Sequence, residues 1–166
     1  MRRTHRSAAL AAGISLVVLA AAGTAGAGWK SAHGAVRTQT QTPVDVPAAT
    51  VDWFVDSHVA LTAGEVFSIS STGTANWDDT DPAVGPGGLS FTKAICAKNQ
   101  YAQPSGWAST GLNCYSLVGK IGGGPVFLVG RAFKLKSPVS GELYLGFNDD
   151  YPYDNSGDFL ATVTTP

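Results

Sequence analysis

Short stretches in which apolar and polar residues alternate make up most of the chain after about residue 50. In EVFSISS, Phe67 and Ile69 alternate with serines, and in GELYLGFND the two leucines and Phe147 share one face. A repeat of two residues is typical of strands that bury one face and expose the other. Glycine and proline interrupt the pattern at intervals of roughly 8–12 residues, and an amphipathic helical repeat is missing.

Seven or eight such stretches predict an all-β fold. The predicted strands include VDWFVDS from Val51, EVFSISS, CYSLVGKIGG, PVFLVGRAF, GELYLGFND and the C-terminal DFLATVTT. Several short alternating strands separated by turns are typical of an antiparallel β-sandwich. In that fold the half-buried strands form the core, and the loops at the two ends are available for binding.

The N-terminal residues differ from this pattern. A basic start precedes the mostly apolar run from Ala8 to Ala22, and Ala25-Gly26-Ala27 offers a small-residue cleavage site. These features predict a secretory signal peptide over residues 1–27. The apolar run has about 15 residues, fewer than the roughly 20 that a membrane-spanning helix needs. An uncleaved anchor is the alternative. Residues 28–49 are polar and contain prolines, which predicts a flexible leader before a folded domain at 50–166.

Charge and cysteine content narrow the classes of partner. Removal of the signal would leave eight basic and twelve acidic residues, a net charge of −4. This balance argues against a nucleic-acid partner and against docking on anionic membranes. Export also favours a disulfide between Cys96 and Cys114, although two free buried thiols are the alternative. Such a disulfide would stabilise the fold by about 3 kcal/mol.

Two loops collect seven of the twelve acidic residues. NWDDTDP holds Asp78, Asp79 and Asp81, and NDDYPYDNSGD holds the other four. Clustered carboxylates repel one another, and Ca²⁺ is the simplest neutralising ion because it binds six to eight oxygens in flexible geometry. The alternative is a solvated turn, since Asp, Asn, Gly, Pro and Ser are ordinary turn residues. The spacing does not match an EF-hand.

Catalytic arrangements are not evident. His58 is the one histidine in the expected domain, no nucleophile-elbow motif accompanies it, and we expect it to be an exposed strand residue. An acid–base pair for glycoside hydrolysis could be drawn from the two loops, but nothing in the sequence places one carboxyl in an apolar pocket. We therefore expect a protein that is not an enzyme.

Aromatic residues flank the acidic loops. Trp77 precedes Asp78, and Tyr151 and Tyr153 lie inside the second loop. A flat ring can lie against the C–H face of a sugar while polar groups bind its hydroxyls. Trp77 could equally be a core residue.

The chain resembles the PA-IL-like calcium-dependent galactose-binding lectins. The resemblance lies in LTAGEVFSISSTGTANW, LVGKIGGGPVFLVG and above all SGELYLGFNDDYPYDNSGDF, which follow one another in the family's order. It implies a jelly-roll sandwich of the galactose-binding-domain type and a secreted lectin that binds Ca²⁺ and a carbohydrate. An unpaired sandwich edge could also support an oligomer.

The resemblance also implies a set of site residues. Side-chain oxygens of Asp149, Asp154 and Asn155 and the carbonyls of Trp77 and Tyr151 would bind calcium. The sugar would then contact Trp77, Asp149, Asp150 and Asp154, with two adjacent hydroxyls on the metal. The loop DDTDPAVGPGG lacks the His and Gln with which the family's galactose lectin contacts its sugar, so the resemblance does not fix which sugar is bound. The alternative is a structural or adhesion module in which calcium only joins the two loops.

Overall fold

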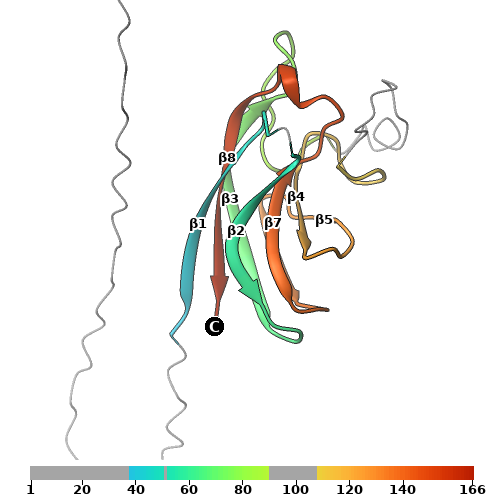
Figure 1. Cartoon of the computed structure of the whole chain (residues 1–166). Helices are drawn as coiled ribbons and strands as arrows, with labels where there is room; N and C mark the ends of the chain where they lie inside the picture. The colour runs from blue at the N-terminus through green and yellow to red at the C-terminus, as the bar shows by residue number, and fades with distance from the viewer. Residues whose placement is uncertain (1–37, 51, 90–107) are drawn as a thin grey trace, which may run out of the picture. The chain divides into compact units, whose positions relative to one another are not determined.

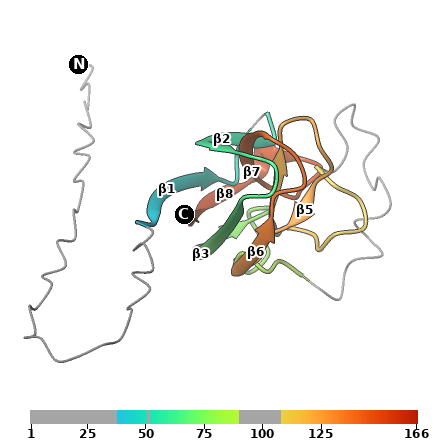
Figure 2. The same ribbon diagram turned by 90° about the horizontal axis from the view of Figure 1, so that it is seen from below.

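Two four-stranded antiparallel sheets pack face to face around one hydrophobic core (Figures 1 and 2). The computed structural model describes residues 38–50, 52–89 and 108–166, and no helix within these residues is long and apolar enough to cross a membrane. The all-β antiparallel sandwich expected from the alternating pattern is confirmed, whereas the jelly-roll topology stays a prediction. The signal peptide at 1–27 and Cys96 lie outside the described residues.

The first sheet has the strand order β1-β8-β3-β6 and the second the order β2-β7-β4-β5. The strands span β1 Thr40–Pro47, β2 Phe54–Leu61, β3 Val66–Asn76, β4 Leu117–Ile121, β5 Phe127–Leu128, β6 Ala132–Lys136, β7 Gly141–Phe147 and β8 Ser156–Thr165. A short 3₁₀-helix, η2, covers Pro152–Asp154 between β7 and β8.

Inward side chains from both sheets fill the core as the alternation predicts. Phe67, Ile69 and Phe159 from the first sheet are buried, as are Leu143 and Leu145 from the second. Each buried side chain of this size stabilises the fold by about 1.5–3 kcal/mol relative to its exposure in water. The outward positions on the same strands are mostly polar, which is why the period of two predicted these strands correctly.

The prediction of a flexible leader over residues 28–49 is wrong for its last part. Thr40–Pro47 forms β1, which pairs with β8 along its whole length and buries Val44 and Val46 against the core. Pro43 and Pro47 suggested a loop, but β1 is an edge strand, and proline is tolerated where one side of a strand has no hydrogen-bonding neighbour. The folded part therefore begins ahead of residue 50.

A second difference concerns PVFLVGRAF, which was expected to be one strand. Gly130 has a φ of 63°, a conformation that glycine adopts without strain, and it breaks the segment in two. Phe127–Leu128 becomes β5 in one sheet, and Ala132–Lys136 becomes β6 in the other. The chain thus crosses between the sheets at this glycine.

His58 is exposed, as expected, but its strand is irregular. The register between β2 and β7 shifts between Asp56 and Ala60, and His58 within this segment has a φ of 56°. Its Nδ1 lies 3.7 Å from the carboxylate of Asp56. The contact is exposed, so it contributes little to stability.

Shortening Val46 tests whether β1 is part of the fold. Val46 is fully buried and opposite Phe159, so Val46→Ala should lower the free energy of unfolding by about 2 kcal/mol through loss of core packing. Asp45→Ala is the matched control, because Asp45 is exposed on the same strand and should change stability by less than about 0.5 kcal/mol. Urea unfolding measures both variants, and equal, negligible effects would show that the segment is a leader after all.

Candidate functional site at the end of the sandwich

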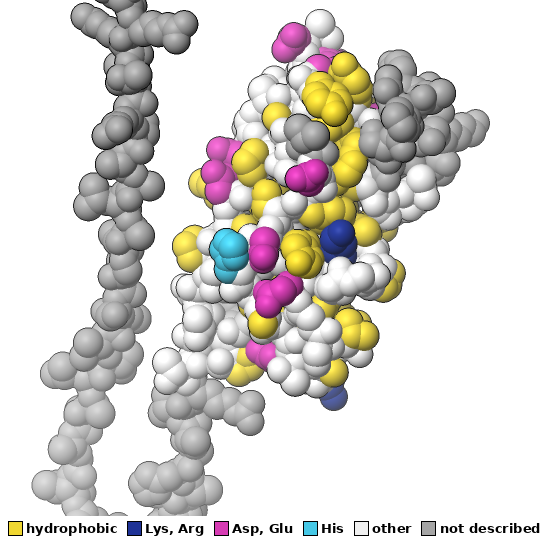
Figure 3. Space-filling model, viewed as in Figure 1, with side chains coloured by type: hydrophobic (Ala, Val, Ile, Leu, Met, Phe, Trp, Pro, Cys, Tyr) yellow, Lys and Arg dark blue, Asp and Glu magenta, His cyan; other side chains and the backbone are white. Residues whose placement is uncertain are grey.

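The pairing of β3 with β8 brings the two acidic loops to one end of the molecule. The antiparallel ladder ends with Asn76 opposite Ser156, so Trp77, which begins the first loop after β3, lies beside Asn155, which ends the second loop before β8. β7 ends at Phe147 at the same end, and the chain then crosses to β8 through η2 (upper end in Figure 1). Acidic and hydrophobic side chains lie together there in Figure 3.

Asn148 anchors the start of the second loop. Its side chain is completely buried, donates from Nδ2 to the Asn113 carbonyl at 2.9 Å and accepts at Oδ1 from the Ser109 N–H at 2.8 Å. Its backbone N–H and carbonyl are bonded to Ser116 and Tyr115. Four hydrogen bonds therefore fix the position from which Asp149 and the residues after it project. Sequence analysis did not single out Asn148, because an asparagine at a strand end is also an ordinary turn residue.

Unpartnered oxygens are concentrated at this end. Among the described residues, four buried side-chain polar atoms lack a hydrogen-bond partner: Oδ1 of Asn113, Oδ2 of Asp149, Oδ2 of Asp150 and Oδ1 of Asn155. All four are acceptors, and three belong to the same seven-residue stretch. A buried acceptor without a partner costs free energy, and a carboxylate costs most. A group of such oxygens fits a positively charged ligand.

The pKa of Asp149 reflects its burial beside other acidic groups. Burial raises the pKa of its carboxyl to about 7, and repulsion from Asp150 acts in the same direction. Hydrogen bonds from the Asn155 side chain and from the Asp150 N–H, at 2.7 Å from Oδ1, only partly oppose this rise. A cation beside Asp149 would favour its ionised form and lower the pKa again.

Asp154 links the second loop to the first. Its side chain is exposed, and its pKa is raised, first because the surrounding loops remove part of its hydration and then because Asp78, Asp79 and Asp150 repel its charge. The carboxylates of the two loops therefore lie within electrostatic range of one another. Calcium would offset this repulsion.

Asp78 organises the first loop. Its Oδ1 accepts hydrogen bonds from the backbone N–H groups of Thr80 and Asp81, at 2.6 and 2.7 Å, and from the Thr80 hydroxyl at 3.1 Å. These bonds lower the pKa of Asp78. The side chain thus closes a turn of the kind that Asp residues often form. Its Oδ1 is therefore already occupied by hydrogen bonds within the loop.

The aromatic residues have two different environments. The half-buried ring of Trp77 is stacked on Tyr115, with centroids 4.3 Å apart, and Tyr115 in turn is stacked at 6.3 Å on Phe147 at the edge of the core. Tyr115 has a φ of 57°, an unusual value for a residue with a side chain. Tyr151 and Tyr153 are instead 38% and 68% exposed, with their rings edge to face. The exposed ring surface at this end is therefore on the tyrosines.

The predicted site residues have different degrees of burial. Asp149, Asp150 and Asn155 are buried, Trp77 is half-buried, and Tyr151 and Asp154 are exposed. Within the described part of the chain, no three His, Cys, Asp or Glu side chains converge closely enough to hold a metal ion. The expected calcium set has only two carboxylates, so it depends on an amide and on backbone carbonyls as well. The residues present fit calcium through their unpartnered buried oxygens.

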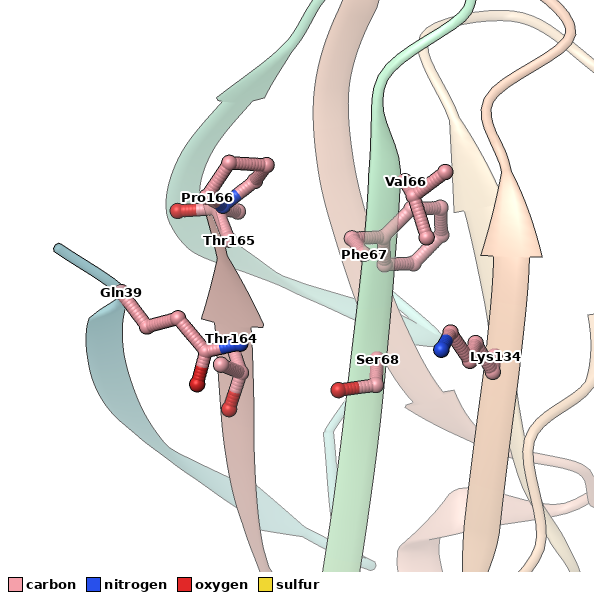
Figure 4. Close-up of a pocket in the computed structure, with 8 residues that line it drawn as sticks. All are labelled: Gln39, Val66, Phe67, Ser68, Lys134, Thr164, Thr165 and Pro166. Carbon is pink, nitrogen blue, oxygen red and sulfur yellow. The ribbon is translucent and has the colours of Figure 1, made fainter. Parts of the chain in front are cut away.

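Two hollows lie at the other end of the sandwich. One, of about 240 Å³, is lined by residues that include Gln39, Val66, Lys134 and Thr164, at the start of β3 and the end of β8 (Figure 4). The other, of about 300 Å³, is mostly apolar and includes Ile121. Neither is lined by an acidic residue. The acidic residues of the two loops thus lie away from both hollows.

Cys114 belongs to the segment that packs beneath the second loop. Its side chain is completely buried, and its carbonyl accepts a hydrogen bond from the Leu89 N–H at 3.0 Å. Because Cys96 lies outside the described residues, the disulfide between the two stays a prediction.

Comparison with solved structures supports the lectin-like fold. The chain is similar to the EclA N-terminal domain, described as a PllA-like lectin, with a TM-score of 0.56 and 23% sequence identity over 75% of this chain and 95% of that one. No protein-family model and no curated protein matches the chain. The similarity establishes the fold, and membership of the PA-IL-like family stays a prediction.

The raised pKa of Asp149 predicts how stability depends on pH in the presence of EDTA. A carboxyl whose pKa is higher in the folded protein than its ordinary value of 3.8 favours folding when protonated. The free energy of unfolding should therefore fall as the pH rises from about 4 to about 7, by at most about 1.4 kcal/mol per pH unit. Thermal unfolding at several pH values measures this slope.

Asp149→Asn is the informative variant, because an amide does not titrate. Its free energy of unfolding should therefore change less between about pH 4 and pH 7 than that of the wild type. Asp158→Asn removes the same charge from an exposed position on β8 and should keep the slope of the wild type. Parallel curves for the wild type and Asp149→Asn would contradict the assignment.

Proposed function

We propose that this protein is a secreted, non-catalytic lectin that binds a carbohydrate through calcium at the loop-bearing end of the sandwich. The observation that carries the proposal is the set of buried, unpartnered oxygens of Asp149, Asp150 and Asn155, beside the strand register that brings the start of the first loop next to the end of the second. Such oxygens are the ligands that calcium prefers. The lectin-like fold agrees with this use of the site.

The proposed calcium ligands are the ones that the resemblance implies. Asp149, Asp154 and Asn155 would contribute side-chain oxygens, and Trp77 and Tyr151 would contribute backbone carbonyls. Asn155 is already oriented, because its Nδ2 donates to the Ala48 carbonyl at 3.1 Å and leaves Oδ1 without a partner. Asp154 is exposed, so its carboxylate can turn toward the ion.

Sugar binding would use the same residues from the solvent side. When bound, calcium would supply coordination positions for two adjacent hydroxyls of a sugar such as galactose. The carboxylates of Asp149 and Asp154 would accept the hydroxyl protons, and the backbone of Asp150 would add a polar contact. The exposed rings of Tyr151 and Tyr153 offer apolar surface for the C–H face of the sugar, while Trp77 would act mainly through its carbonyl.

Calcium should stabilise the folded protein in a way that depends on Asp154. An ion that binds only the folded form increases the free energy of unfolding by about 2.7 kcal/mol at 100 times its dissociation constant, and this raises the melting temperature. Asp154→Ala should lose most of this rise, whereas Asp158→Ala, from an exposed position on β8, should keep it. Differential scanning fluorimetry with calcium and with EDTA measures the rise. No rise in the wild type would end the calcium proposal.

Sugar binding should require the ion. A glycan array, followed by calorimetry with the best ligand, should show binding in calcium that disappears with EDTA and in Asp149→Asn. Calcium-dependent melting without a sugar signal would favour the alternative, a structural or adhesion module in which the ion only joins the loops. Turnover of aryl glycosides that is abolished in Asp149→Asn would contradict the absence of catalysis.

A further inference from the structure

The hollow of about 240 Å³ at the start of β3 contains a row of polar side chains that the proposed function does not use. The strand register forms this row, because Ser68 on β3 lies opposite both Lys134 on β6 and Thr164 on β8. Gln39, which directly precedes β1, lines the hollow beyond Thr164 (Figure 4). One ammonium group, two hydroxyls and one amide therefore line a single hollow.

Lys134 carries the only charged side chain that lines this hollow. The one ion pair among the described residues is between His58 and Asp56, so Lys134 has no carboxylate partner in that part of the chain. The backbone oxygen of Pro166, at the rim, points away from Lys134 (Figure 4). An unpaired ammonium group beside hydroxyl donors is suited to a carboxylate or another small anion.

The distribution of charge favours an anion at this end of the sandwich. Strand β6 carries two of the four Lys and Arg side chains in the described ranges, Lys134 and Lys136. The seven acidic residues of the two loops lie at the opposite end, where the ladder of β3 and β8 reaches Asn76 and Ser156. An anion is therefore repelled from the acidic end and attracted to this one.

Lysine on β6 also has a purely structural explanation. β6 lies at the edge of its sheet, and lysines on an edge strand discourage pairing with another chain. Lys134 and Lys136 are both exposed and share the outer face, so they would serve this purpose equally. Only Lys134 lines the hollow, so the two explanations make different predictions for the two lysines.

The size and mixed surface of the hollow suit one sugar ring. Its volume is somewhat below the roughly 300–1,000 Å³ of pockets for drug-sized ligands, which limits the ligand to a small group. Val66, 43% exposed, and Pro166 supply apolar surface for the C–H groups of a ring. The hydroxyls and the amide of the polar row match the hydroxyls of a sugar.

We propose that this hollow binds an acidic sugar, such as a terminal uronic acid, without calcium. The ammonium group of Lys134 and the hydroxyl of Ser68 donate to the carboxylate of the sugar. Thr164 and Gln39 hydrogen-bond to its ring hydroxyls, and Val66 contacts the ring. This site is separate from the proposed calcium site and does not depend on it.

Titration of calcium-free, ¹⁵N-labelled protein with glucuronate, followed by NMR, tests the assignment. The backbone amide signals of Ser68, Lys134 and Thr164 should shift together. Glucose has a similar ring without the charge and should bind at least about fivefold more weakly, because it lacks the charge-assisted hydrogen bond. Acetate at the same ionic strength supplies the charge without the ring. Equal affinities for acetate and glucuronate would show a simple anion site and overturn the sugar assignment.

Two pairs of variants provide matched controls. Lys134→Met should weaken glucuronate binding at least about fivefold, whereas Lys136→Met, on the same face but outside the hollow, should weaken it less than about twofold. Ser68→Ala should likewise weaken binding more than Ser70→Ala, since Ser70 lies outside the hollow on the same face of β3. Equal effects of the two lysine variants would overturn the proposal and favour the edge-strand explanation.

Calcium separates this inference from the proposed function. If glucuronate binds only after calcium is added and shifts the signals of Asp149–Asn155, the sugar binds at the acidic end. That result would support the proposed function and overturn the present inference. If the protein binds no calcium but glucuronate shifts the signal of Lys134, the proposed function is wrong and the present inference stands.

Discussion

The antiparallel pairing of β3 with β8 is the constraint on which the arrangement at the acidic end depends. It runs from Ser68 opposite Thr164 to Asn76 opposite Ser156, and the register is fixed because a slip of one residue would turn Phe159 and Ile69 out of the core. The same register decides that the start of the first loop lies next to the end of the second. Hydrophobic packing thus supplies the force that holds mutually repelling carboxylates together.

That repulsion has a cost within the described structure. Asp149 and Asp150 are buried without a paired lysine or arginine from the described residues, and the raised pKa of Asp149 reflects the loss of hydration. A fold that maximised its own stability would place uncharged groups here. Asn148, with four hydrogen bonds beneath the loop, keeps the backbone in place in spite of this cost. The calcium ion that we propose for this site would offset the cost.

Much of the fold could be predicted from the alternation of residues, and its failures have physical causes. β3, β7 and β8 were found because each has one apolar face. β1 was missed because Pro43 and Pro47 are common in loops, and only the neighbouring strand shows that they lie on a sheet edge. PVFLVGRAF was read as one strand because local sequence does not show that the chain changes sheets at Gly130.

By itself, the sequence determined which residues could carry chemistry and which faces of the strands are apolar, because side-chain type and period are local properties. It identified both acidic loops, for which calcium binding stays a prediction. Only the tertiary structure decided that the ring of Trp77 stacks on Tyr115, that Asp154 is exposed, and that Oδ2 of Asp150 is buried without a hydrogen-bond partner. Burial and hydrogen-bond partners arise from segments distant in the chain, so no local pattern encodes them.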